Sequence, residues 1–494
     1  MKRIRLLSFL AAFVLLASLT ACDSVVEDAT GPIASAGSED LNDPDEVDFL
    51  INGIRARSNN VQDNITVQSS LMSDQFIYGG ANGGGATFPT FRDLMQAFPA
   101  ASNPLNNNSV DGTQNHLGQY RFLADDLLKR LEQLGSEAFG GTDDPRWVDG
   151  QFAGNFHGGI ARYYWAAYFG RTQQDGGGVI SDIDNPADSE RSEFIPSDEM
   201  FTLAVNKLDA ALPFADEYQT KVVNSVKARI ALLQDNLIDA DSLAQEGLEP
   251  GDPAFQNQYV DRAGNQSNVW DAQGGLSRAQ TVPAPRFFYS PDYLGGDYEA
   301  AESARIPILN PAGSDGDPEY DAYTADAGSV TDDGNFLANR DAEHPLRFET
   351  GLSAGDDVTL PLQGRYTGRD SNINFITWQE MNLIRAEAAE RGAASGDPLA
   401  LINEVRVSHG IAELGAADYD GLNTIFMERD KEMFTTGIRL LDQRRAEVYS
   451  LNAEGLDLDM HGWHLEGDSE TLWWYLPITL AERNNNPNLP TELP

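Results

Sequence analysis

Apolar residues recur at helical spacing along most of the chain, which predicts a series of amphipathic α-helices. The clearest stretch runs from Leu117 to Leu134, where apolar residues follow steps of three and four and Gly135 can close the helix. The other predicted helices cover about 46–59, 147–169, 197–211, 223–237, 238–248 and 375–392, and further helices begin near 398 and 421. The chain is therefore expected to be mainly α.

Small residues within the third of these helices indicate how the helices pack. Gly154, Gly158 and Gly159 would weaken an isolated helix, so we expect them to allow close approach of a neighbouring helix. Helices of this length, paired antiparallel, suit a tetratricopeptide-type stack. No strict period of about 34 residues is visible, so the predicted repeats are degenerate.

The helical rhythm stops in two long segments. Residues 251–370 are rich in Gly, Pro, Asp, Asn and Tyr, and residues 60–114 contain further glycine-marked turns. Connections of this length without structure of their own are uncommon in compact domains. We therefore expect both segments to be loop-rich insertions that form a lobe with short strands, where function is commonly carried.

The N-terminus has the pattern of an export signal. The chain starts with basic residues, and the apolar run Leu6–Leu19 follows. This run is too short to span a bilayer, so the pattern predicts a signal peptide over residues 1–21. The run ends in Leu-Thr-Ala-Cys, which resembles a bacterial lipobox, and Cys22 is the single cysteine of the chain. Lipidation of Cys22 is therefore expected. An ordinary signal peptide with an incidental cysteine is the alternative. Residues 22–44, small and acidic, read as a flexible tether.

The charge of the chain restricts its partners. Acidic residues outnumber basic ones 77 to 34, giving a net charge of −43, and removal of residues 1–21, with three bases and no acid, leaves about −46. Such a charge disfavours nucleic acid and anionic lipid surfaces. Hydrophobic residues still make up 41% of the chain, so it is globular. An acidic, lysine-poor globular chain suggests an exported protein of a high-salt organism, where self-repulsion is screened.

The stretch from Gly421 to Arg445 combines apolar and charged positions. Arg429 falls on an apolar helical face, and a buried arginine must be paired to be tolerated. Gly437 can end this helix in a left-handed turn. Glu428, Arg429 and Glu432, followed by Gly437, Arg439, Asp442 and Arg445, form a motif that resembles the C-terminal signature of the SusD/RagB family of nutrient-capturing outer-membrane lipoproteins. The segments FHGGIARYYWAAYFG, NSVKARIALL and FITWQEMNLIRAEAAERG resemble helices of the same family.

This resemblance extends over most of the mature chain and implies a specific architecture. It implies one SusD-like domain over residues 45–494, helical at 45–250 and 371–450 apart from the two insertions. It also implies a lipid-anchored protein of the outer membrane, on the cell surface, that binds a nutrient and passes it to a SusC-like TonB-dependent transporter. The nutrient expected in this family is a glycan or oligosaccharide. In the family the signature belongs to the scaffold and not to the ligand site.

Catalytic and metal-binding patterns are weak in this sequence. There is no HExxH, GxSxG or phosphate loop, and we expect no cofactor and no enzyme activity. His461 and His464 lack a suggested third ligand, and the acidic run 315–321 departs from the calcium-loop pattern at Tyr320. A lipid-anchored glycan hydrolase remains an alternative, because two carboxylates cannot be selected among so many. The second alternative is a helical-repeat scaffold that binds no small ligand.

Aromatic residues in the two insertions are the candidates for ligand binding. Flat rings stack on the C–H faces of sugars, while polar neighbours hold the hydroxyl groups. Trp270 lies in the polar, turn-rich stretch GNQSNVWDAQGG, which would not normally bury a large ring. Asn268 and Asp271 are its hydrogen-bonding neighbours. Tyr289, Tyr293 and, from the first insertion, Tyr78 are the second choices, and the alternative is that these rings form the core of the lobe.

Overall fold

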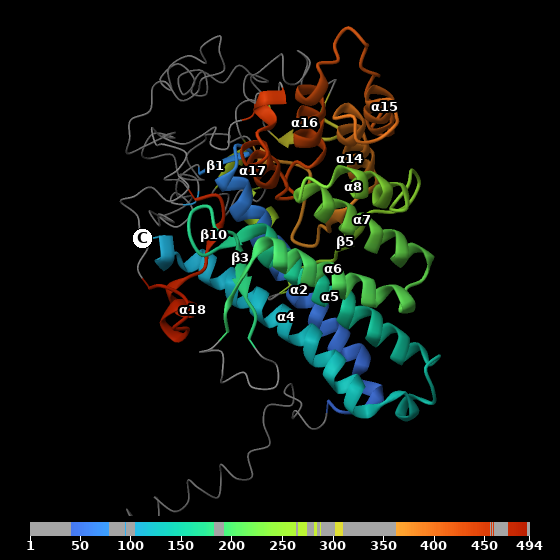
Figure 1. The fold of residues 1–494 in the computed structure, drawn as a ribbon, viewed down its shortest axis with the longest axis vertical. Helices are drawn as coiled ribbons and strands as arrows, with labels where there is room; N and C mark the ends of the chain where they lie inside the picture. Colours follow the sequence, from blue (N-terminus) through green and yellow to red (C-terminus); the bar gives the residue numbers. More distant parts are fainter. Residues whose placement is uncertain are drawn as a thin grey trace, which may run out of the picture.

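The protein is a stack of antiparallel helices with short strands between and beside them (Figure 1). The computed structural model describes residues 41–78, 94, 104–181, 192–262, 265–273, 281–283, 287, 302–309, 362–454, 456, 458 and 473–491. In the described residues, each β-sheet consists of only two strands. The predicted mainly α fold, with a degenerate helical stack, is confirmed.

The first half of the stack holds six helices of the described chain, each packed against its neighbours. They are α2 (Val47–Met72), α4 (Asn108–Leu134), α5 (Pro145–Tyr168), α6 (Ser197–Ala211), α7 (Glu217–Leu233) and α8 (Leu237–Gln245). Gly135 ends α4 with a φ of 71°, as predicted. A Cβ on Gly154 would lie 2.7 Å from Leu128, and one on Gly159 would lie 2.8 Å from Leu208. These two glycines therefore let α5 approach α4 and α6 closely.

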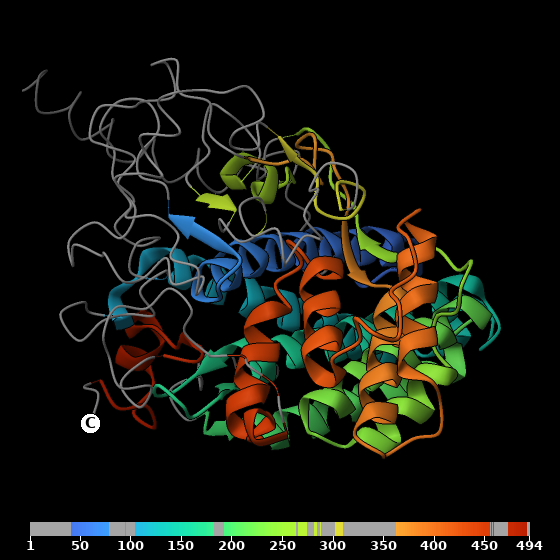
Figure 2. The ribbon, with the colours of Figure 1, turned by 90° about the horizontal axis from the view of Figure 1, so that it is seen from above.

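The second half of the chain returns to the same stack. Its helices are α14 (Trp378–Glu390), α15 (Pro398–Ser408), α16 (Gly421–Glu432), α17 (Arg439–Val448) and α18 (Leu480–Asn485). Helix α14 packs on α7, α8, α15 and α16, so it joins the two halves. Seen from above, α2 (blue) lies between these helices and the short elements of the second insertion (yellow-green; Figure 2).

The strands are short and pair segments that are distant in sequence. The antiparallel pairs are β1 (Phe76–Tyr78) with β6 (Thr281–Pro283), β3 (Gly177–Val179) with β4 (Phe194–Pro196), β5 (Phe255–Asn257) with β9 (Ile373–Ile376), and β7 (Ile308–Leu309) with β8 (Leu362–Gln363). Strand β2 (Phe169–Gly170) pairs in parallel with β10 (Leu476–Pro477). Single 3-10 turns cover Pro44–Glu46, Pro104–Asn106, Ser136–Phe139, Leu212–Phe214 and Leu451–Glu454. The pairing of β1 with β6 shows that the two insertions meet.

Several element boundaries differ from those predicted. Helix α4 begins at Asn108 instead of near Leu117, and α7 covers Glu217–Leu233 instead of 223–237. Helix α2 runs on to Met72 instead of ending at Asn59, so the first part of the segment 60–114 is helical. Its later turns carry buried polar residues, such as Gln62 and Gln68, and these break the apolar stripe. Phe375 begins no helix but lies in β9, and Thr377 caps α14 by accepting the N–H of Glu380.

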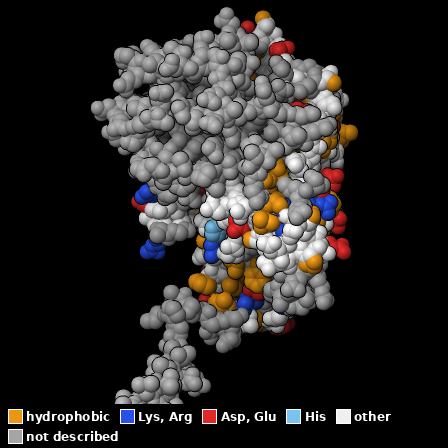
Figure 3. Space-filling model, turned by 90° about the vertical axis from the view of Figure 1, so that its left-hand side faces the viewer, with side chains coloured by type: hydrophobic (Ala, Val, Ile, Leu, Met, Phe, Trp, Pro, Cys, Tyr) orange, Lys and Arg blue, Asp and Glu red, His pale blue; other side chains and the backbone are white. Residues whose placement is uncertain are grey.

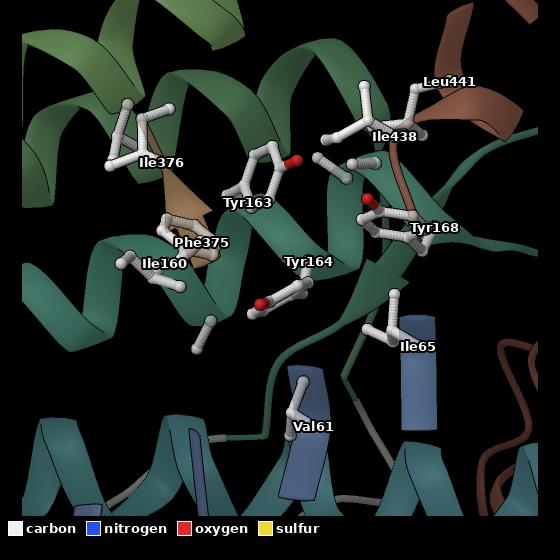
Figure 4. Close-up of a cluster of buried hydrophobic side chains, with 14 of the residues drawn as sticks. Val61, Ile65, Ile160, Tyr163, Tyr164, Tyr168, Phe375, Ile376, Ile438 and Leu441 are labelled. Carbon is white, nitrogen blue, oxygen red and sulfur yellow. The ribbon is translucent and has the colours of Figure 1, made fainter. Parts of the chain in front are cut away.

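The core between the two halves is aromatic. Tyr163 and Tyr164 of α5 contact Phe375 of β9, and Tyr168 packs against both tyrosines (Figure 4). Ile65 of α2 completes the same cluster. Burial of these rings and aliphatic side chains stabilises the fold by roughly 2 kcal/mol for each fully buried side chain. The aromatic residues of this cluster are therefore used for packing.

The charged positions of α16 and α17 are paired inside the protein. Arg429 donates through Nε and Nη2 to the two carboxylate oxygens of Asp442, both at 2.9 Å. Arg445 donates to Asp442 at 3.0 Å and to Glu387 of α14 at 2.8 and 2.9 Å. Gly437 has a φ of 85°, so the predicted left-handed turn between the two helices is confirmed. This part of the signature is a buried ionic scaffold.

Candidate functional site

The short helix α9 (Asn268–Gln273), which carries Trp270, is anchored on α2 by one buried carboxylate. Asp63 accepts the N–H of Asn268 at 2.6 Å and the N–H of Val269 at 2.7 Å. Burial raises the pKa of Asp63 to about 7, although both backbone N–H groups favour its ionised form. The side chain of Ser267 adds a cap by accepting the N–H of Trp270 at 3.3 Å. These bonds fix a helix too short to be stable alone.

The indole of Trp270 is half-buried and lies against an arginine. The guanidinium carbon of Arg369 is 5.4 Å from the centre of the ring, within the range of a cation–π interaction. The Nε of Arg369 donates to Asp271 at 3.0 Å, and its carbonyl oxygen accepts the N–H of Ser267 at 2.9 Å. The ring is thus held in place by the chain around it. We call α9 with Asp63 and Arg369 the α9 platform.

The two polar neighbours predicted beside Trp270 differ in their accessibility. Asn268 is exposed at the start of α9, and its backbone N–H is bound by Asp63. Asp271 is 6% exposed, and its carboxylate receives Arg369. The structure therefore brings Trp270 and Asn268 to the surface of one short helix, whereas Asp271 serves to hold Arg369.

The remaining predicted site residues are placed only in part. Tyr78 lies in β1, with its backbone opposite Thr281 of β6, eight residues after Gln273 at the end of α9. Tyr289 and Tyr293 lie outside the described residues, as do Cys22 and the histidines 461 and 464. The acidic run 315–321 also lies outside them. The β1–β6 ladder brings the first insertion beside the platform.

The described residues contain no group of three or more His, Cys, Asp or Glu side chains that could hold a metal ion. Within the same part of the chain, no helix has both the length and the hydropathy needed to cross a bilayer. The face shown in Figure 3 mixes acidic, basic and hydrophobic side chains over its described surface. Charge therefore does not mark out a site on this face.

Sequence reasoning missed the residues that make the platform rigid. Asp63 falls on the buried side of α2, and a carboxylate between apolar residues such as Val61 and Ile65 is itself a sign of a specific partner. Nothing in the sequence identified that partner, because it lies 205 residues away. Arg369 is likewise 98 residues from Asp271. Neither distance can be inferred from local pattern.

Comparisons with known proteins identify the fold. No family model and no curated protein matches the sequence. Among solved structures, a SusD superfamily protein from Bacteroides thetaiotaomicron has 15% identity and a TM-score of 0.62, over 90% of this chain and 98% of that chain. Surface glycan-binding protein A from Bacteroides uniformis has 15% identity and a TM-score of 0.56, with 90% and 98% coverage. A laminarin-binding SusD-like protein has 15% identity and a TM-score of 0.53, with 90% and 97% coverage.

These matches extend over nearly the whole of the solved chains, so the likeness concerns the complete fold and not one helical repeat. At a sequence identity of 15%, the similarity establishes the fold. The resemblance to the SusD/RagB family inferred from the C-terminal motif is confirmed at that level.

Proposed function

We propose that this protein is a SusD-like surface lipoprotein that binds a glycan at the α9 platform and delivers it to a SusC-like TonB-dependent transporter of the outer membrane. The observation that carries the glycan site is a half-buried indole, Trp270, fixed on a short helix by buried hydrogen bonds. Aromatic rings held rigidly lose little entropy when a sugar stacks on them. The exposed amide of Asn268 lies on the same helix and supplies hydrogen bonds.

The fold supports the same function. The solved structures with this fold include proteins described as glycan-binding and laminarin-binding. A binding protein needs a preformed surface and no catalytic group, which agrees with a platform built from a ring and an amide. Delivery to a transporter rests on the family resemblance, and the acidic charge of the chain would assist docking if the partner surface is basic.

Replacing Trp270 with alanine is expected to weaken glycan binding roughly tenfold, because a stacked ring contributes about 1.4 kcal/mol. The melting temperature should change little, since the ring is half-buried. Isothermal titration with laminari-, malto- and xylo-oligosaccharides first finds the ligand, and titration of the variant then gives the change in Kd.

Tyr419→Ala is the matched control, because Tyr419 is another half-buried ring, on the loop before α16, and its loss should leave Kd unchanged. The same glycans are analysed for products after long incubation. Turnover would favour the hydrolase alternative. Lost stability with intact affinity would assign Trp270 to the core of the lobe.

Anchoring is tested separately. Replacing Cys22 with alanine is expected to move the protein from the membrane fraction to the soluble fraction, because the acyl chains that hold it can no longer be attached. Cell fractionation followed by immunoblotting measures this. A Cys22→Ala variant that still sediments with the outer membrane would show that another element anchors the chain.

A further inference from the structure

A cleft of about 800 Å³ lies apart from the α9 platform, between the first halves of α2 and α5, the start of α7 and strand β5. Neither Trp270 nor Arg369 lines it. Its wall is partly aromatic. Phe152, Phe255 and Tyr218 are half-buried there, and Phe156 lies behind them, stacked on Phe152 at 5.2 Å and edge-on to Phe255 at 5.3 Å. Rings braced in this way keep their orientation when a ligand stacks on them.

A largely buried histidine also lines the cleft, and one of its two ring nitrogens is hydrogen-bonded within the protein. His157 is 6% exposed and lines the cleft, and the Nδ1 of its ring lies 2.7 Å from the Tyr120 hydroxyl. Burial, with a smaller effect of Arg55, lowers the pKa of His157 to about 3, so the ring is neutral. The other ring nitrogen, Nε2, makes no hydrogen bond within the described chain. A ligand hydroxyl would satisfy it in either tautomer, because a hydroxyl both donates and accepts.

The polar groups at the rim favour a neutral ligand. Arg55 is exposed and forms no ion pair within the described chain, so its N–H groups are available. Asp48, Asp149 and Asp216 also line the cleft, and burial, Asp48 and Asp216 raise the pKa of Asp149 against the opposing effect of Arg55. Three carboxylates against one guanidinium repel anions. Vicinal hydroxyls can accept from Arg55 and donate to a carboxylate at the same time.

We propose that this cleft is a second binding site, which takes a segment of a neutral oligosaccharide. The proposal rests on the proposed glycan-binding function and adds a site separate from the platform. One element supports both sites. Asn59 of α2 donates to Asn265 at the cleft edge at 2.8 Å, and Asp63, one turn further along α2, holds the start of α9. The chain segment from β5 to α9 therefore passes from one site to the other.

A single-cysteine reporter tests the cleft directly. Cys22 is the only cysteine, so in a Cys22→Ala background Asn52→Cys places one environment-sensitive fluorophore on an exposed residue of α2 that lines the cleft. Titration with laminari-, malto- and xylo-hexaose is expected to change its emission saturably with at least one sugar. Adding Arg55→Ala should weaken that response roughly tenfold, because charged hydrogen bonds are lost. Adding Trp270→Ala should leave it unchanged.

Gln245→Cys, exposed on α8 outside the cleft, is the matched control and should give no response. If the reporter at position 52 gives no response while a hexaose still binds at a Trp270-dependent site, the cleft is not a binding site and the proposed function is unaffected. Loss of the response in Trp270→Ala would mean that one site produces both signals, which also overturns it. A response to oligolysine and to no hexaose would show that the cleft is a site for basic peptides.

Discussion

Replacing Glu380 with alanine is expected to lower the free energy of unfolding by about 3–5 kcal/mol, because it leaves a buried arginine without its counter-ion. Arg229 of α7 donates to Glu380 of α14 through Nε at 2.7 Å and through a second nitrogen. The two side chains are 3% and 1% exposed. Arg229 also lies 4.9 Å from the centre of the Phe375 ring. The pair therefore joins the two halves of the stack at their aromatic core.

Urea unfolding followed by circular dichroism measures this loss. Asp209→Ala is the matched control, since Asp209 pairs with Lys227 at the surface and its removal should cost less than about 1 kcal/mol. A double variant, Arg229→Met with Glu380→Leu, removes both charges and should recover most of the stability. If Glu380→Ala unfolds at the same urea concentration as the wild type, the pair does not join the halves in solution.

Replacing Glu428 with alanine is expected to have an effect of similar size, about 3–5 kcal/mol. Arg305 of the second insertion and Arg406 of α15 each donate to Glu428 at 2.6 Å. Lys431 lies 3.7 Å away. Removal of Glu428 leaves Glu302 as the carboxylate shared by these three cations, so the segment 302–309 should also separate more easily from α16. Hydrogen exchange of that segment measures the local effect.

The pH dependence of this variant follows from the pKa of Glu428. Burial alone would raise the pKa, but Arg305, Lys431 and Arg406 outweigh it and lower the pKa from 4.5 to about 2. A lowered folded-state pKa gives stability that is present above about pH 4.5 and is lost as the pH falls towards 2. The wild type should therefore lose its advantage over Glu428→Ala in this range, by up to about 1.4 kcal/mol per pH unit. A stability difference that stays constant from pH 6 to 3 would contradict the assignment. Glu428→Gln, which keeps the shape without the charge, should match the alanine variant in its pH profile.

Much of the fold could be predicted from the sequence because the information is local. An amphipathic period of 3.6 residues marks helices such as α4, and capping residues mark their ends, as Asp397 does for α15 by accepting the N–H groups of Leu399 and Ala400. The sequence also predicted that Arg429 has a buried partner, because burying an unpaired arginine on an apolar face costs too much free energy. The partner itself, Asp442, lies only 13 residues away.

For the candidate site, the sequence predicted where the key ring lies in the chain but not the contacts around it. The polar surroundings of Trp270 indicated an accessible ring, and the ring is half-buried. Its neighbour Asp271 was expected to serve a ligand, but its carboxylate is occupied by Arg369. The pattern could not show this, because Arg369 comes from a segment 98 residues further along the chain. A polar residue in a loop looks the same in sequence whether it faces solvent or holds a neighbouring chain.

The sequence by itself thus determined the helical stack, the ionic motif of α16 and α17 and the position of a candidate ring, because periodicity, capping and the cost of burying charge act within a few turns of one chain. Tertiary structure alone decided the length of α2, whose buried Gln62 donates to the carbonyl oxygen of Asn374 in β9 at 2.9 Å. It also decided that Asp63 anchors α9, and that α2, α5, α7 and β5 enclose a cleft. The first two depend on a polar group finding a partner more than 200 residues away, and the cleft depends on the packing of segments that are distant in sequence, so all three are fixed only when the whole chain packs.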